Sequence, residues 1–323
     1  MMPNFKKKNL NNNLPSFLNS RNGWGELFEL KRPSYPHLHQ IEPTNACPYN
    51  CIMCPRGKHM KRKIGFMEID LFCKVIDEVS TYSDEIKKKE IELFHFGESL
   101  LHPQITEMNA YATSKRLNTV LSVNAAEFNH ELSEKLISSK AGKIIVSLDG
   151  FDSDSFKTIR GRSIDYNKAI DNIINASDFI KTHDSSTKLV VRMILLTTNS
   201  HKTKEFEQFW KEKLINTEIR EFFPWGEPEM QDLGTFNKYP PYMPCPFSWQ
   251  YLVVQWNGDV VACCRDYNGV NVMGNIKDSS LVEIWNGNVY ETFRKDMING
   301  IYQNRICGPC MDLYYSESVA KNR

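Results

Sequence analysis

The sequence has no long hydrophobic run and almost no net charge, and each absence excludes a class of protein. No stretch of its 323 residues approaches the roughly 20 consecutive apolar residues that a membrane-spanning helix needs. Lys and Arg number 40 against 39 Asp and Glu, which leaves a formal charge of +1. A balance this close gives no overall attraction to nucleic acids or acidic membranes. We therefore expect neither a membrane protein nor a nucleic-acid-binding protein.

Two further features are missing. No segment repeats along the chain with a period of about 20 to 50 residues, which argues against a solenoid. Residues 1–13 are polar and lack the apolar centre of a signal peptide. We therefore expect a cytoplasmic protein, in which thiols stay reduced. Nine cysteines in that compartment predict metal binding or catalysis rather than disulfides.

Short apolar runs alternate with amphipathic segments from residue 38 to about residue 223. The runs predict strands at 38–41, 91–96, 119–123, 143–148, 189–196 and 218–223. The amphipathic segments predict helices at 68–79, 131–138, 166–180 and 203–214. Alternation of strands and helices is typical of an α/β domain with a parallel sheet.

The alternation stops near Trp225, and the chain beyond it is richer in Gly, Pro and aromatic residues. Apolar runs at 251–255 and 260–263 flank Asn257 and Gly258. An Asn-Gly dipeptide favours the tight turn of a β-hairpin, so these runs predict one. A helical pattern over residues 281–298 follows.

These patterns predict a chain of three parts. Residues 1–36 form an N-terminal extension with a short helix near residues 24–30. Residues 37–225 form the α/β domain. Residues 226–323 form a smaller, cysteine-rich domain.

Three cysteines lie close together directly after the first predicted strand: Cys47, Cys51 and Cys54. A [4Fe–4S] cluster held by three thiolates keeps one iron open for another ligand. A structural zinc site normally takes a fourth protein ligand, which His59 could supply. The spacing favours the iron–sulfur cluster and leaves zinc open.

A second group of cysteines lies near the C-terminus: Cys245, Cys263, Cys264, Cys307 and Cys310. Cys245 precedes the predicted hairpin, two adjacent cysteines end it, and the last two form a C-x-x-C pair. Four thiolates from three separate segments can surround one metal centre completely. The pattern predicts a saturated site, either zinc or [4Fe–4S].

The spacing Cys47-x3-Cys51-x2-Cys54 after a first strand resembles the cluster loop of the radical S-adenosylmethionine (SAM) superfamily. Met53 stands where that family usually has an aromatic residue. The resemblance implies a partial (β/α)6 TIM-like barrel whose open iron binds SAM. It also implies reductive cleavage of SAM to a 5′-deoxyadenosyl radical, which abstracts hydrogen from substrate. An external one-electron donor, such as flavodoxin or ferredoxin, would supply the electron.

Other segments at predicted strand ends resemble the SAM-binding elements of the family. Residues 96–98 resemble the GGE motif that holds the SAM amino group, with Phe96 in place of the first Gly; a surface carboxylate at Glu98 is the alternative. Residues 122–124 occupy the place of the ribose contacts, and residues 147–150 resemble the S-x-D-G element. Ser147 and Arg160 would bind the methionyl carboxylate. The implied SAM contacts are Phe96, Gly97, Glu98, Ser122, Asn124, Ser147 and Arg160.

The C-terminal cysteines resemble the SPASM/twitch extension of the same superfamily. The resemblance selects Cys263 over Cys264 and implies the auxiliary ligands Cys245, Cys263, Cys307 and Cys310. Since no cysteine follows Cys310 in the sequence, it implies the twitch type with one auxiliary [4Fe–4S] cluster. That cluster would accept an electron from a substrate radical, or would only stabilise a small domain.

An oxidised cluster near a substrate radical suits net oxidation of an alcohol carbon. We therefore predict a dehydrogenase-like oxidoreductase acting on a small sugar- or aminocyclitol-like molecule, with Arg192, Glu227 and Asp266 as candidate catalytic residues. Peptide modification is an alternative, and so is redox-neutral epimerisation, in which Cys264 would return hydrogen. A zinc or iron–sulfur scaffold without enzymatic activity is a further alternative.

Overall fold

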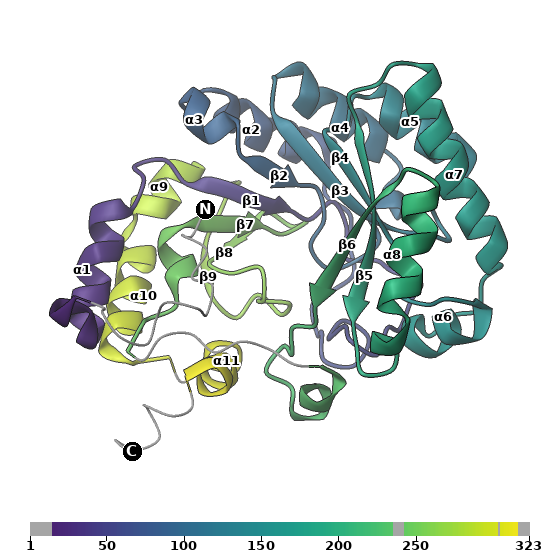
Figure 1. Cartoon of the computed structure of the whole chain (residues 1–323). Coiled ribbons are helices and arrows are strands. Elements are labelled where there is room, and N and C mark those ends of the chain that lie inside the picture. Colours follow the sequence, from purple (N-terminus) through teal and green to yellow (C-terminus); the bar gives the residue numbers. More distant parts are fainter. Residues whose placement is uncertain (1–14, 235–241, 303, 316–323) are drawn as a thin grey trace.

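The structure is a computed structural model that describes residues 15–234, 242–302 and 304–315 (Figure 1). Its sheet has the order β6-β5-β4-β3-β2-β1-β7-β8-β9, and β1 to β6 run parallel. The strands are β1 (His37–Ile41), β2 (Glu90–Glu92), β3 (Asn118–Asn124), β4 (Lys143–Ser147), β5 (Lys188–Leu195), β6 (Asn216–Glu221), β7 (Tyr251–Val254), β8 (Asp259–Val261) and β9 (Val272–Asn275).

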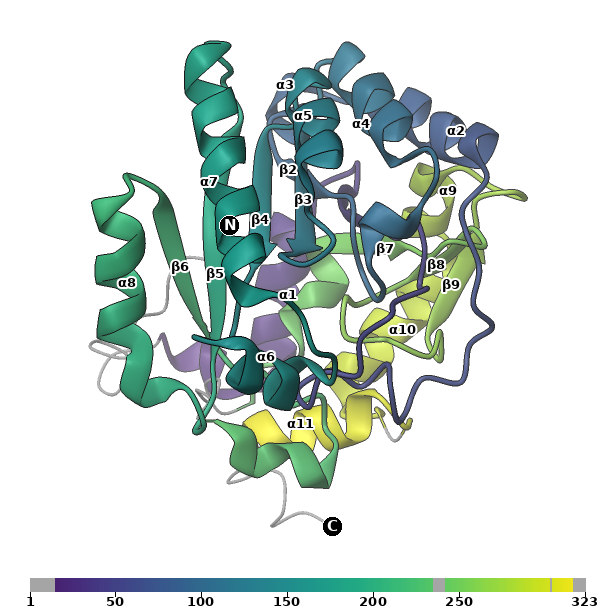
Figure 2. The same ribbon diagram turned by 90° about the vertical axis from the view of Figure 1, so that its right-hand side faces the viewer.

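Helices pack along the convex side of β1 to β6, as the alternation predicts (Figures 1 and 2). The α-helices are α1 (Arg21–Lys31), α2 (Ile69–Ser80), α3 (Asp84–Lys87), α4 (Ile105–Ser114), α5 (His130–Ser138), α6 (Ser153–Arg160), α7 (Tyr166–Thr182), α8 (Thr203–Glu212), α9 (Leu281–Asn286), α10 (Asn288–Asn299) and α11 (Cys307–Tyr315). The 3-10 helices are η1 (Ser16–Asn19), η2 (Ser99–Leu101), η3 (Ser200–Lys202), η4 (Pro228–Leu233) and η5 (Pro246–Trp249). In the described part of the chain, no helix is both long and apolar enough to cross a bilayer.

One predicted strand ends earlier than expected. The prediction extends it to residue 96, whereas β2 ends at Glu92. Beyond it the chain turns toward the end of β1, where the N–H of Phe96 donates to Glu42 and the N–H of Glu98 donates to the carbonyl of Ala46. These bonds satisfy the backbone outside the sheet, so the apolar run continues without a strand.

The C-terminal part of the chain extends the same sheet. β7 pairs in parallel with β1, and β8 and β9 add antiparallel strands beyond it. The predicted hairpin between β7 and β8 is confirmed, and Gly258 in its turn has a φ of +91°. One sheet therefore runs through both sides of residue 225, and the division into domains there stays a prediction.

The two faces of the sheet differ in chemistry. Leu121, Ile144 and Val191 are buried in the hydrophobic core between the strands and the helices. Since side chains alternate along a strand, the neighbouring residues project from the concave face, and there Asn124 on β3 lies opposite Ser147 on β4. The polar residues at the ends of the strands are thereby placed on the concave side.

Candidate functional site

The first cysteine group lies on the loop between β1 and α2. The loop is attached to α6, because the N–H of Asn50 donates to the carbonyl of Arg160 and the N–H of Ile52 to that of Ile159. Burial raises the pKa of Cys47 to about 11 and that of Cys54 to about 12. Such thiols become thiolates when a cationic metal centre offsets the loss of solvation.

Gly97 brings the predicted SAM-binding segment onto this loop. It has a φ of +129°, and a Cβ at this position would collide with the carbonyl oxygen of Thr44. The next residue, Glu98, donates its N–H to the carbonyl of Ala46 at 2.8 Å. Only glycine combines this conformation with so close an approach. The second glycine of the motif is therefore the position that the packing requires.

Glu98 is a buried carboxylate, which contradicts the alternative of a surface residue. It accepts hydrogen bonds from the N–H groups of Leu100 at 3.1 Å and Asn124 at 2.8 Å. Burial raises its pKa to about 7. The side-chain nitrogen of Asn124 is buried without a hydrogen-bond partner. A buried acceptor and an unsatisfied donor beside the cysteine loop fit a polar ligand such as SAM.

Arg160, at the end of α6, reaches the cysteine loop. Its Nη1 lies 3.8 Å from the Sγ of Cys51, and its Nη2 forms an ion pair with Asp149. Burial by itself would lower the pKa of Arg160, but the charges of Asp149 and Cys51 raise it. Its Nε is buried and has no hydrogen-bond partner, so a donor remains for an anionic ligand. Asp149 belongs to the S-x-D-G element, yet the sequence reasoning assigned it no role.

A polar row crosses the concave face at the ends of three more strands. Ser147 pairs in register with Asn124 on one side and with Arg192 on the other, and Arg192 pairs with Glu218 on β6. Arg192 is 7% exposed, and its Nη2 lies 2.8 Å from the Oε2 of Glu218. Glu218 is therefore the anionic partner of this buried guanidinium. Ser122 lies further back on β3, opposite Ile145.

The opposite side of the concave face holds a group that the sequence reasoning missed. His39 on β1 places its Nε2 3.7 Å from the Oε2 of Glu92, and its ring lies 4.4 Å from that of Tyr251. The Tyr251 hydroxyl lies 3.3 Å from the Sγ of Cys264. Burial by itself lowers the pKa of His39. A hydrogen bond to Cys264 and the charge of Glu92 raise this pKa by more than burial lowers it, so the net shift is upward. The two histidines of the first strand, His37 and His39, were the available signal.

The second cysteine group comes together from three segments. Cys245 precedes η5, Cys263 follows β8, and Cys307 and Cys310 lie on α11. Burial is the main cause that raises the pKa of Cys245 and that of Cys307 to about 12, and neighbouring cysteines contribute to each.

Nitrogen donors surround these thiols. Arg265 donates its backbone N–H to Cys263 at 3.3 Å and its Nη1 to Cys310 at 3.2 Å. The side-chain amide of Asn271 donates to Cys307 at 3.5 Å. Such donors stabilise thiolates around an iron–sulfur cluster, so the residues fit this group. The adjacent Cys264 instead contacts Tyr251 and His39, which supports Cys263 as the ligand.

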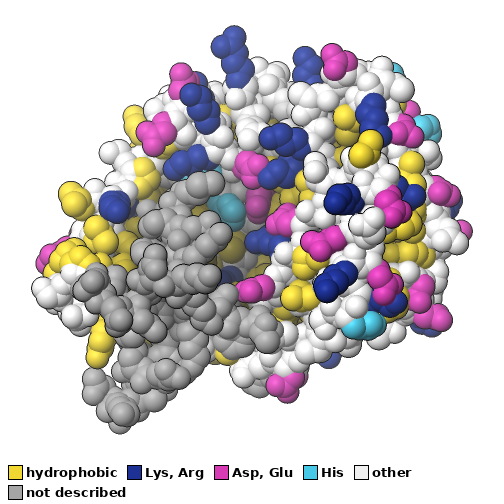
Figure 3. Space-filling model, viewed as in Figure 1, with side chains coloured by type: hydrophobic (Ala, Val, Ile, Leu, Met, Phe, Trp, Pro, Cys, Tyr) yellow, Lys and Arg dark blue, Asp and Glu magenta, His cyan; other side chains and the backbone are white. Residues whose placement is uncertain are grey.

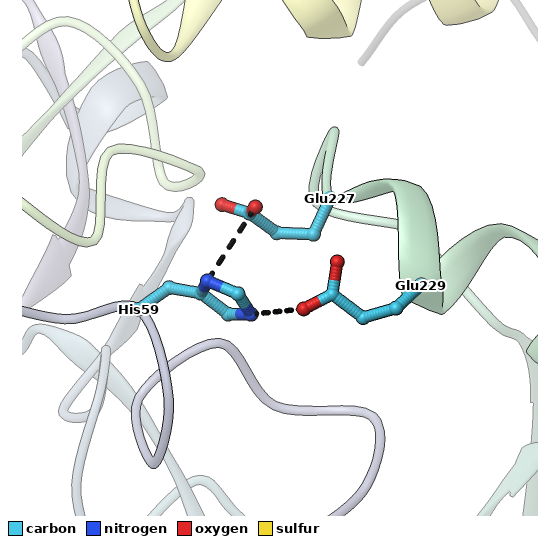
Figure 4. Close-up of side chains that lie close together, drawn as sticks. All are labelled: His59, Glu227 and Glu229. Atoms are coloured by element: carbon cyan, nitrogen blue, oxygen red, sulfur yellow. Dashed lines mark ion pairs between the residues drawn. The ribbon is translucent and has the colours of Figure 1, made fainter.

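The imidazole of His59 lies against two carboxylates. Its Nδ1 lies 3.5 Å from Glu227 and its Nε2 lies 2.8 Å from Glu229 (Figure 4). Within the described ranges, this is the one group of three His, Cys, Asp or Glu ligand atoms within 4.8 Å of one another. His59 is therefore engaged by two carboxylates and is not placed as a fourth ligand of the first cysteine group.

Two of the predicted catalytic carboxylates are engaged in local contacts. Asp266 is fully buried, and its oxygens accept the N–H groups of Val270 at 2.9 Å and Asn271 at 2.7 Å. The carboxylate stabilises the loop that carries Asn271, and its role as a catalytic base stays a prediction. Glu227 is held by His59 and accepts the hydroxyl of Tyr267.

Aromatic side chains fill the space between the two cysteine groups. Trp225 donates its indole N–H to the carbonyl of Met53 at 2.8 Å, and its ring lies 5.3 Å from that of Phe96. The guanidinium of Arg265 lies over the ring of Phe223, 3.3 Å from its centre. Phe96, predicted as a SAM contact, is thus 3% exposed and part of this aromatic layer.

Comparison with known proteins agrees with this geometry. Residues 41–209 match the family model of the radical SAM superfamily, and residues 245–311 match SPASM, an iron–sulfur cluster-binding domain. An AdoMet-dependent heme synthase of Methanosarcina barkeri is 29% identical over 126 residues, 39% of this chain and 35% of that relative. A heme synthase of Nitratidesulfovibrio vulgaris is 29% identical over 37% of this chain and 31% of its own length. The chain thus spans about a third of these curated relatives.

Solved structures of similar fold carry both regions. BtrN in complex with AdoMet and 2-DOIA has a TM-score of 0.56 at 18% identity, covering 84% of this chain and 91% of that one. SuiB of Streptococcus suis bound to S-adenosylmethionine has a TM-score of 0.65 at 14% identity, covering 85% and 72%. AnSMEcpe with bound AdoMet has a TM-score of 0.59 at 15% identity, covering 86% and 91%. At these identities the likeness establishes the fold alone.

Proposed function

The chain belongs to the radical SAM superfamily, and from that premise we propose that it oxidises an alcohol carbon of a small, sugar- or aminocyclitol-like molecule. When bound, SAM and its [4Fe–4S] cluster supply the radical that removes a hydrogen atom from substrate, and the auxiliary cluster supplies an electron acceptor. Cys47, Cys51 and Cys54 would hold the first cluster. Cys245, Cys263, Cys307 and Cys310 would hold the second.

The polarity of the concave face carries this proposal. Arg192 and Glu218 line one side of it and His39 and Glu92 the other, and the charge of Glu92 acts on Arg192 across the space. Figure 3 shows the molecule hollowed in this region, with basic, acidic and histidine side chains gathered there. Hydrogen-bonding side chains of both signs suit a ligand with several hydroxyl or amino groups.

His39 is the proposed acceptor of the hydroxyl proton. Oxidation of an alcohol carbon to a carbonyl removes one proton from the oxygen, and a base within reach accelerates that loss. Glu92 lies 3.7 Å from the imidazole and stabilises the imidazolium that forms. We propose His39 and Glu92 for the role of base in place of Asp266, which is buried in its loop. Arg192 is proposed to orient the substrate, since its guanidinium lies on the same face.

The test uses anaerobically reconstituted protein with a panel of 2-DOIA, other aminocyclitols and seryl or cysteinyl peptides. A substrate deuterated at the alcohol carbon should transfer deuterium to 5′-deoxyadenosine and yield one carbonyl product per deoxyadenosine. The H39A variant should keep deuterium transfer and lose about 10²-fold in carbonyl formation. His37 lies on the same strand with its Nε2 against the carbonyl of Glu90, so H37A is the matched control.

Other outcomes select the other candidate functions. Solvent deuterium at the carbon, lost in C264A, would establish epimerisation, for which the thiol beside Tyr251 is placed. Turnover of peptides alone would establish peptide modification. Equal rates for H39A and wild type would remove His39 from the reaction.

A further inference from the structure

We propose that residues 58–66 form the docking surface for a small acidic electron-transfer protein, which reduces the cluster held by Cys47, Cys51 and Cys54. The inference rests on the reductive chemistry of the proposed function, because only that chemistry needs such a donor. The surface, called the lysine patch below, consists of Lys58, Lys61, Lys63, Ile64 and Phe66.

The three lysines place positive charge on the surface of the protein. Each is exposed, and none makes an ion pair within the described part of the chain. The neighbouring Arg62, by contrast, forms an ion pair with the buried Glu42 at 2.7 Å. Glu229 lies against His59 at 2.8 Å, and the charge of Lys58 also contributes to lowering the pKa of Glu229. Lys61 and Lys63 therefore supply most of the exposed charge that would attract an acidic partner and raise its rate of encounter.

Hydrogen bonds hold the lysine patch directly beside the cysteine loop. Asn45 donates its side-chain N–H to the carbonyl of Lys63 at 2.9 Å and accepts the N–H of Gly65 at 2.9 Å. Asn45 precedes Cys47 by two residues. On the other side, Arg62 donates to the carbonyl of Tyr267, between β8 and β9, at 2.8 Å. The patch is thus held next to the loop that carries the first cysteine group.

Apolar side chains complete the surface. Ile64 is 61% exposed and Phe66 is 43% exposed, and both are large hydrophobic residues next to the lysines. Leu101, the last residue of η2, is 38% exposed, and the ring of Phe66 lies 5.8 Å from that of the next residue, His102. A small apolar centre with a charged rim is typical of weak, transient redox complexes. The combination fits a small acidic protein better than a free anion.

The experiment compares two triple variants with the same change of charge. K58E/K61E/K63E reverses the lysine patch. K168E/K204E/K211E reverses three exposed lysines on α7 and α8, which lie on the opposite side of the molecule (Figure 2). The rate of reduction of the first cluster by flavodoxin hydroquinone is measured by stopped flow at low and high salt, in holoenzyme that retains both clusters.

The patch variant should be reduced by flavodoxin about tenfold more slowly and lose the salt dependence of the wild type. Reduction by photoreduced 5-deazariboflavin, a small uncharged reductant, should not change, and the control variant should match wild type in both assays. Equal loss in both variants, or none in the patch variant, would overturn the proposal. Slower reduction by deazariboflavin in the patch variant would also overturn it, since the lysines would then support the cluster itself.

A second measurement uses the wild type alone, so the proposal can still be tested if the triple variant does not fold. In the wild type, the flavodoxin rate should fall steeply with added salt, while the rate with uncharged photoreduced 5-deazariboflavin should not; a flat flavodoxin rate would contradict docking by charge. Failure of the proposed function looks different, because wild type would then form no carbonyl product from the substrate panel, whatever the rate at which its first cluster is reduced.

Discussion

The two cysteine sites are built in opposite ways. The first lies on one short loop after β1, where three thiols fall within eight residues. The second gathers four thiols from segments that begin more than sixty residues apart, at Cys245 and at Cys307. The first leaves a position for an outside ligand, whereas the second is saturated by protein. A local loop suits binding and chemistry, and a non-local site also connects the segments that it joins.

The hydrogen-bond donors around the two cysteine sites also differ. Around the first lie polar atoms without partners, on Asn124 and Arg160, which await a ligand. Around the second, Arg265 and Asn271 already donate to three of the four thiols. The first site thus has unsatisfied donors for an outside ligand, whereas the thiols of the second are already engaged by protein donors.

The strongest test of this difference removes the first site. The triple variant C47A/C51A/C54A should lose about four irons and form no 5′-deoxyadenosine above background, because nothing then binds SAM at an open iron. Iron analysis, absorbance spectra and chromatography of the reaction mixture measure this. About four irons should remain at the second site. Deoxyadenosine formation by the variant would contradict the assignment of the two sites.

Removal of the second site should separate the two activities. C307S/C310S should also lose about four irons, yet keep SAM cleavage while losing carbonyl formation. Because α11 is then no longer joined to η5 and β8, the unfolding midpoint should drop by several degrees in a thermal melt. Cys73, on α2, supplies the control C73S, which should keep both clusters. Loss of SAM cleavage in C307S/C310S alone would instead give the second cluster a role in the first step.

SAM affinity should depend on pH through Glu98. Burial raises its pKa to about 7, so below pH 7 this carboxyl is mostly protonated and accepts hydrogen bonds poorly. The Kd for SAM should therefore be about tenfold weaker at pH 6 than at pH 8. Equilibrium dialysis with reconstituted protein measures it. E98Q should bind weakly at both values, and a pH dependence that survives in E98Q would assign it to another group.

The smallest expected effect concerns the potential of the second cluster. Arg265 brings positive charge and an N–H donor to Cys310. R265Q should make the reduction potential more negative by on the order of 60 mV, the one-electron equivalent of a tenfold change. R265K should shift it less, because the charge remains. Redox titration followed by electron paramagnetic resonance measures both, and an unchanged potential in R265Q would show that the hydrogen bond does not tune this cluster.

Periodicity predicted most of the strands and helices because each is amphipathic or apolar over its own length. The prediction for residues 91–96 was wrong at its C-terminal end. There the N–H groups of Phe96 and the nearby Glu98 donate long-range hydrogen bonds to Glu42 and Ala46, outside the sheet. The pairing of β7 with β1 joins residues more than two hundred positions apart, and no local pattern contains that information. The placement of Asp266 in a closed loop was equally hidden, since burial of a carboxylate depends on distant donors.

The sequence by itself determined the ligand chemistry and the fold class. Cysteine spacing is a local property, and the alternation of strands with helices follows from side-chain periodicity. Only the tertiary structure decided which polar residues share the concave face. His39, Glu92 and Cys264 come from separate parts of the chain, and they meet because sheet register and the turn after β8 bring them together. Proximity of that kind results from packing, which sequence spacing does not encode.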